Sequence, residues 1–126
     1  MSSSYVELHT ASAFSFLQGA SLPEALVDRA AELGYSALAL VDRDGVYGAP
    51  RFHKAARSAG IRPIIGAELT IRAGRADTEL RTRDLPRQPC PPRLPDQSFL
   101  LPVLCESAEG YRNLCLLITW MKMRAP

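Results

Sequence analysis

The chain is poor in cysteine and has no long apolar run. Its three cysteines, Cys90, Cys105 and Cys115, show no CxxC spacing, which argues against a disulfide framework or a cysteine-ligated metal. We interpret Cys105 and Cys115, which lie in apolar patterns, as buried reduced thiols. No apolar run approaches the ~18 residues of a membrane span, and no basic stretch followed by an apolar one marks a signal peptide. We therefore expect a cytoplasmic protein with no membrane partner.

The chain also lacks a strong excess of charge. Its net charge of +2 argues neither for nor against a nucleic-acid partner. There is no glycine-rich phosphate loop and no Ser/His/Asp set with persuasive spacing. With 126 residues, of which 47% are hydrophobic and 22% charged, the chain has the length and composition of about one small soluble domain.

Three apolar runs are present, and each ends in a polar residue. They run to His9, to the Asp42-Arg43-Asp44 turn and to Glu68. Each is followed by a helix pattern or a turn, which is typical of a parallel α/β protein with polar chemistry at the carboxyl ends of its strands. The sequence therefore predicts a site where these strand ends meet.

Residues 1–71 are predicted to form three β/α units. We expect helices from Pro23 to Leu33 and from Pro50 to Ala59, closed by Gly34 and Gly60. Ser21 to Glu24 has the pattern of a capping box. In the preceding loop we expect the large side chains Phe14, Phe16 and Leu17 to face inward.

Residues 72–97 differ in composition from the rest of the chain. They hold six arginines, five prolines and four acids, with hardly any apolar periodicity. We interpret them as a solvated loop or a disordered insertion. A basic arm that binds nucleic acid is the alternative, although the interleaved acids and missing aromatics weaken it.

Residues 98–126 are predicted to form a fourth β/α unit of the same domain. A strand over 98–106 contains Pro102, which suggests an edge strand, and Ser107 is the expected N-cap of a helix over 108–123. Right-handed crossovers would make the whole sheet parallel. Leu117 and Trp120 widen the apolar face of this helix, so the helix and the open sheet edge would need cover.

Each candidate site residue also has a purely structural interpretation. His9 could be a hydrogen-bonded histidine at a strand end, and Glu68 could belong to an internal ion pair with Arg43. Asp42 and Asp44 could serve the turn before Gly45.

We interpret His53 as an exposed helical histidine. Imidazole and carboxylate groups suit divalent cations, but two or three ligands are few for a catalytic cluster.

Four blocks of sequence resemble the PHP (polymerase and histidinol phosphatase) domain that begins bacterial DNA polymerase III alpha subunits, especially the error-prone branch. These blocks are Tyr5–Ser21, Ala37–Ala56, Ile65–Leu69 and Glu109–Thr119. The likeness covers nearly the whole chain except 72–97. It implies the first four β/α units of a distorted, TIM-like (β/α)7 barrel, which would be incomplete here.

The resemblance also implies which residues stand at metal positions. Active members of the family bind a cluster of divalent metals at the strand ends and cleave phosphoesters. His9 and Glu68 match two of five early ligand positions. At the other three, Ala11 and Arg43 replace histidines and Gln18 replaces an aspartate. Arginine cannot ligate a metal and brings a permanent positive charge.

The resemblance therefore leads us to expect a degenerate domain with a scaffold role in DNA replication, repair and translesion synthesis. The polymerase active site would lie elsewhere in the alpha subunit, so we expect no catalytic residue and no cofactor in this chain. Its partners would be the remainder of the subunit or other polymerase subunits, with DNA reached only through the full-length protein. A second copy could also cover the exposed sheet edge. The alternative is a metal-dependent phosphoesterase or 3′→5′ exonuclease-type hydrolase that binds zinc or manganese.

Overall fold

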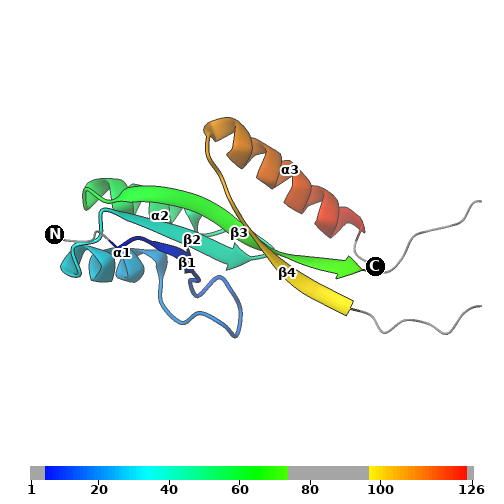
Figure 1. Cartoon of the computed structure of the whole chain (residues 1–126), viewed down its shortest axis with the longest axis horizontal. Helices are drawn as coiled ribbons and strands as arrows, with labels where there is room; N and C mark the ends of the chain where they lie inside the picture. The colour runs from blue at the N-terminus through cyan, green and yellow to red at the C-terminus, as the bar shows by residue number, and fades with distance from the viewer. Residues whose placement is uncertain (1–4, 74–96, 125–126) are drawn as a thin grey trace, which may run out of the picture.

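The computed structural model describes residues 5–73 and 97–124 as a curled, four-stranded half-barrel sheet with three helices (Figure 1). The elements in chain order are β1 (Glu7–Thr10), α1 (Pro23–Glu32), β2 (Ala37–Arg43), α2 (Ala49–Ser58), β3 (Arg62–Ala73), β4 (Gln97–Leu104) and α3 (Ala108–Arg124). The strands are neighbours in the order of the sequence, β1-β2-β3-β4. The predicted α/β fold class is therefore confirmed.

The pairing of the last strand differs from the prediction. β1, β2 and β3 are parallel, but β4 runs antiparallel to β3. The expectation of an all-parallel sheet was wrong because it assumed a crossover before the fourth strand, whereas antiparallel neighbours need none. Arg72 and Ala73 belong to β3 and Gln97 to β4. The rest of the predicted loop or insertion lies outside the described residues and stays a prediction.

The first core lies between β2 and the helices α1 and α2. Val27 and Ala30 of α1 and Phe52 of α2 are buried against Leu38 and Leu40 of β2. Alternate side chains of a strand point to opposite faces, so these leucines turn one face of β2 toward the helices. Burial of large apolar side chains, each worth about 1.5–3 kcal/mol, fixes this half of the molecule.

The ends of α1 and α2 confirm most of the predicted signals. Gly34 and Gly60 follow the two helices with φ of 74° and 73°, a left-handed conformation that glycine adopts without strain. Pro23 lies in the first turn of α1, as predicted. The capping box is not formed, because Leu22 is the N-cap and no side chain caps the helix.

A second core lies under α3. Leu114 and Ile118 of α3 are buried with Ala67 and Leu69 of β3. Ser107 accepts a hydrogen bond at Oγ from the backbone N–H of Gly110 (3.2 Å), consistent with the predicted N-cap. In Figure 1, α3 lies apart from α1 and α2, above the crossing of β3 and β4.

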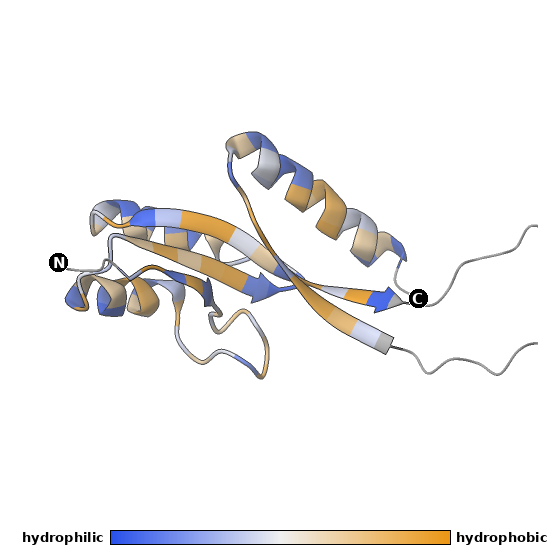
Figure 2. Cartoon of the chain, in the orientation of Figure 1, coloured by the Kyte–Doolittle hydropathy of each residue, from blue (hydrophilic) through white to orange (hydrophobic). Residues whose placement is uncertain are grey.

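Apolar residues remain exposed on α3 and β4. They are Leu116, Leu117, Trp120 and Met123 of α3 and Phe99, Leu100, Leu101 and Leu104 of β4. Figure 2 shows the apolar colour running along β4 and the middle of α3. We call these eight residues the α3/β4 surface. That another part of a longer protein or a partner covers them stays a prediction.

Two further expectations concern the cysteines and the bilayer. Cys105 and Cys115 are free thiols, half-buried rather than fully buried. Burial, with a smaller contribution from Cys115, raises the pKa of the Cys105 thiol. Within the described parts of the chain, no helix is long and apolar enough to cross a membrane.

Candidate functional site at the strand ends

The structure brings His9, Arg43 and Glu68 together. β2 and β3 are in register with Arg43 opposite Glu68, so both side chains lie on the same face of the sheet. His9 Nε2 lies 2.9 Å from Glu68 Oε1, and Arg43 Nη2 lies 3.5 Å from Glu68 Oε2. The expected approach of Arg43 to Glu68 is therefore present. The expectation that the third strand ends at Glu68 was wrong, because β3 continues to Ala73.

The guanidinium of Arg43 is held from a second side by Gln18. The side-chain amide of Gln18 faces the guanidinium, and with its oxygen turned toward it accepts hydrogen bonds from Nη1 and from Nη2, the latter at 2.9 Å. The side chain of Glu68 is 13% exposed, that of Arg43 35% and that of His9 55%. Arg43 thus places a permanent cation between an amide and a mostly buried carboxylate.

Asp42 points to the opposite face and is buried. Its Oδ1 accepts hydrogen bonds from the backbone N–H of Ser12 and from Ser15 Oγ, both at 2.7 Å, and its Oδ2 accepts one from Ser12 Oγ at 2.8 Å. Three neutral donors therefore satisfy the charge, and they tie the β1–α1 loop to β2. Asp42 takes no part in the contacts of Glu68.

The inward side chains of the β1–α1 loop are these two serines. Phe16 and Leu17 are 83% and 88% exposed, and Phe14 is 36% exposed. The prediction that the large side chains face inward was wrong. A buried carboxylate needs donors more than it needs apolar contacts, so Ser12 and Ser15 occupy the inner positions. Their spacing gave no signal in the sequence, because serine is common in loops for other reasons.

Asp44 serves the turn that follows β2. Its Oδ1 accepts from the backbone N–H of Thr70 and its Oδ2 from Thr70 Oγ1, both at 2.7 Å. Its own N–H donates to the carbonyl of Glu68 at 2.9 Å. Its φ of 50° is a left-handed conformation that aspartate tolerates better than most residues. Asp44 therefore links the end of β2 to β3, and the structural interpretation given above describes its contacts.

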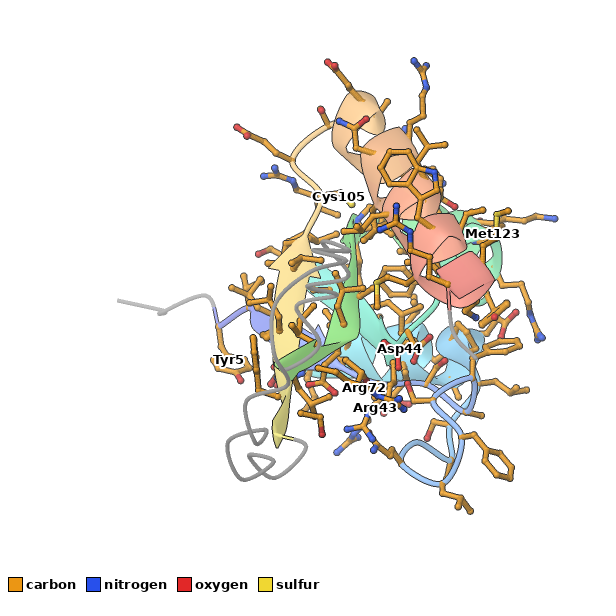
Figure 3. All side chains as sticks on the ribbon, turned by 90° about the vertical axis from the view of Figure 1, so that its right-hand side faces the viewer. Tyr5, Arg43, Asp44, Arg72, Cys105 and Met123 are labelled. Atoms are coloured by element: carbon orange, nitrogen blue, oxygen red, sulfur yellow. The ribbon has the colours of Figure 1, made fainter. Side chains whose placement is uncertain are left out.

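The residues at this sheet end do not fit a cluster of divalent metals. Of the three side chains that meet here, His9 and Glu68 have donor atoms for a metal, whereas Arg43 supplies only positive charge. In the described ranges 5–73 and 97–124, no group of three or more His, Cys, Asp and Glu side chains could hold a metal ion. The second histidine, His53, is exposed on α2. Figure 3 labels Arg43, Asp44 and Arg72, and Met123 on α3; of these, Asp44 and Arg72 line one pocket.

Comparison with known proteins identifies relatives over nearly the whole chain. The family described as PHP domain matches residues 7–125. An error-prone DNA polymerase of Corynebacterium efficiens is 46% identical over 121 residues, which cover 96% of this chain. One from Mycobacterium tuberculosis H37Rv is 50% identical over 110 residues, or 87% of this chain. The chain spans only 9% of the length of each of these relatives.

A solved structure supports the same fold. An amidohydrolase from Chromobacterium violaceum, solved with bound sulfate and no metal, is 36% identical with a TM-score of 0.51. The match covers 56% of this chain and 24% of that one.

Proposed function

The chain belongs to the PHP domain family, and from this premise we propose that it forms the N-terminal part of a degenerate PHP domain in an error-prone DNA polymerase III alpha subunit. Its role there is that of a scaffold in replication, repair and translesion synthesis in the cytoplasm. Polymerase chemistry belongs to other parts of such a subunit. The coverage of 9% of the polymerase relatives supports this assignment to one segment of a longer protein.

One observation carries the degenerate assignment. The Arg43 guanidinium contacts Glu68 and Gln18, two residues at positions that hold metal ligands in active members. A guanidinium has only N–H donors and stays protonated, so it satisfies the carboxylate with a fixed charge and competes with any bound cation. Metal-dependent hydrolysis would require this ion pair to open.

The hydrolase alternative is tested by assaying the purified chain for bound zinc or manganese and for cleavage of a phosphomonoester and of a DNA 3′ end. We expect no turnover above a buffer control. Turnover that disappears in His9→Ala but persists in His53→Ala would contradict the scaffold proposal, because His53 is the matched histidine outside the strand-end group.

The α3/β4 surface supports the scaffold role. β4 is an edge strand of the described sheet, and such an edge invites pairing with another chain. Exposed apolar side chains lie on β4 itself and on α3, the next element along the chain, and exposed apolar patches mark interaction sites. We propose that the remainder of the polymerase subunit, or another subunit, covers it.

If this surface is uncovered in the isolated chain, the chain should self-associate or be marginally stable. Sedimentation velocity should show concentration-dependent association, and the double substitution Leu117→Gln and Trp120→Gln should reduce it. The matched control, Leu22→Gln with Leu33→Gln, removes two exposed leucines beyond this surface and should not. A monodisperse monomer with a sharp cooperative melt would count against the proposal.

A further inference from the structure

A basic pocket lies between the end of β3 and the carboxyl-terminal half of α3. Its cavity of about 540 Å³ is lined by Arg72 of β3 and by Lys122 and Arg124 of α3. The apolar side chains of Ile118 and Met121 also line it. We call it the basic pocket. It is separate from the group of His9, Arg43 and Glu68, none of which lines it.

The pocket carries excess positive charge. Asp44 also lines it, but both of its carboxylate oxygens accept hydrogen bonds from Thr70. Arg72 and Arg124 are exposed, and neither forms an ion pair among the described residues. Three cations therefore face one carboxylate that is already satisfied, which suits an anion such as a phosphate group.

Aromatic side chains extend the surface away from the pocket. Lys122 Nζ donates to the Tyr47 hydroxyl and lies 4.5 Å from the centroid of the Tyr47 ring, which is 60% exposed. The adjacent Gly48 lies close to the β1–α1 loop, since a methyl group added to Gly48 would meet Phe14 Cδ2 at 3.0 Å. Tyr47 therefore lies beside the cations of the pocket, and the β1–α1 loop with its exposed aromatic residues lies next to Tyr47.

We propose that the cations of the basic pocket bind successive backbone phosphates of a single nucleic-acid strand whose bases stack on Tyr47 and the β1–α1 loop. Cations that track the backbone beside exposed aromatic rings are the usual means of binding single strands. A free phosphate would use the cations but not the rings. The pocket would give this segment a direct contact with nucleic acid, beyond the expectation that DNA is reached only through the full-length protein.

The test measures binding of a fluorescein-labelled oligothymidylate to the whole chain by fluorescence anisotropy over a range of salt concentrations. With three phosphate contacts, the logarithm of the affinity should fall with the logarithm of salt with a slope of about −2. Arg72→Gln with Arg124→Gln should weaken binding about tenfold and reduce the slope by about 1.4. Both side chains are exposed, so circular dichroism should show an unchanged fold.

Two control pairs remove the same charge elsewhere. Arg57→Gln with Arg112→Gln alters exposed positions of α2 and α3 away from the pocket. Arg81→Gln with Arg83→Gln alters the arginine-rich segment, whose residues lie outside the described ranges. Both pairs should bind nearly as the unsubstituted chain. An equal or larger loss in either control would overturn the pocket, and the second control would then favour a basic arm.

A second readout separates a strand from a free phosphate. Tyr47→Leu should weaken oligothymidylate binding with little change in the salt slope, because stacking does not release counterions. Titration with inorganic phosphate should show far weaker binding than with the oligonucleotide. Binding of inorganic phosphate with no oligonucleotide binding, or no effect of Tyr47→Leu, would overturn the assignment to a nucleic-acid strand.

Discussion

Asp42, near the end of β2, and Glu68, within the adjacent parallel strand β3, are carboxylates whose charges the fold balances in different ways. Asp42 is 2% exposed and is satisfied by neutral serine and backbone donors of one loop. Glu68 is satisfied by Arg43 and His9, two side chains that are more exposed than Glu68 itself. The first arrangement is internal to the fold and joins a loop to a strand. The second places a fixed organic cation beside a carboxylate that is mostly buried.

The largest effect in this comparison should come from Asp42→Ala. Removing the carboxylate would leave the Ser12 and Ser15 hydroxyls buried without their acceptor, and each unsatisfied group costs about 1–3 kcal/mol. We expect the free energy of unfolding to fall by about 3–4 kcal/mol, measured by urea denaturation followed by circular dichroism. Asp42→Asn, which keeps one acceptor oxygen, should lose less. A neutral result for Asp42→Ala would show that the loop is not tied to β2 in this way.

A smaller effect is expected for Arg43→Met, which keeps most of the aliphatic stem and removes the charge. If the site were dry, loss of the guanidinium would leave Glu68 with His9 as its side-chain partner and would cost up to about 3–5 kcal/mol. Because the Arg43 side chain is 35% exposed, water can solvate Glu68 and the expected loss is about 1 kcal/mol. Arg57→Met is the exposed control. A loss above about 3 kcal/mol would mean that Glu68 behaves as a fully buried charge like Asp42.

The smallest effect on stability is expected at Glu24, a carboxylate that is more exposed than Asp42 and Glu68. Arg51 donates from Nε at 2.7 Å and from Nη2 at 3.1 Å to Glu24, and this hydrogen bonding lowers the pKa of Glu24. Because the pKa of Glu24 is lower in the folded state than in the unfolded chain, the ionised carboxylate stabilises the fold fully at pH values above the ordinary pKa of glutamate. This stabilisation is lost as the pH falls through the pKa of the folded state.

The melting temperature of Glu24→Gln should therefore approach that of the unsubstituted chain as pH is lowered from neutrality to below about pH 4. Arg51→Gln should remove the same pH-dependent part of the melting temperature. Melting curves of Glu24→Gln that shift in parallel with the unsubstituted chain at every pH would contradict the assignment.

The sequence predicted the parallel strands and the helix ends well because burial and turn signals act locally. Continuous apolar runs located β2 and the first part of β3, and Gly34 and Gly60 marked the helix ends. The pairing of the parallel strands places His9, Arg43 and Glu68 together, although Glu68 lies within β3 and not at its end. The parallel pairing of β1, β2 and β3 then brings these residues together regardless of the conformations of the loops. This part of the account needed only hydrophobic pattern and chain direction.

The features that sequence reasoning missed depend on tertiary contacts. Ser12, Ser15 and Thr70 became partners of buried or turn carboxylates only through the folding of segments more than twenty residues away in sequence. The antiparallel direction of β4 had a usable signal, because the preceding segment shows hardly any helical periodicity and a parallel crossover usually needs a helix. The exposure of Phe16 followed from the burial of the two serines, which no hydropathy pattern predicts.

Metal binding tests the central claim most directly. Calorimetric titration with manganese or zinc should give no binding tighter than about 1 mM for the unsubstituted chain, because Arg43 holds Glu68. The triple substitution Ala11→His, Gln18→Asp and Arg43→His should gain measurable affinity, since it restores three donor side chains beside His9 and Glu68. Tight stoichiometric binding by the unsubstituted chain that is lost in His9→Ala would contradict the account, as would a folded triple variant that binds no better.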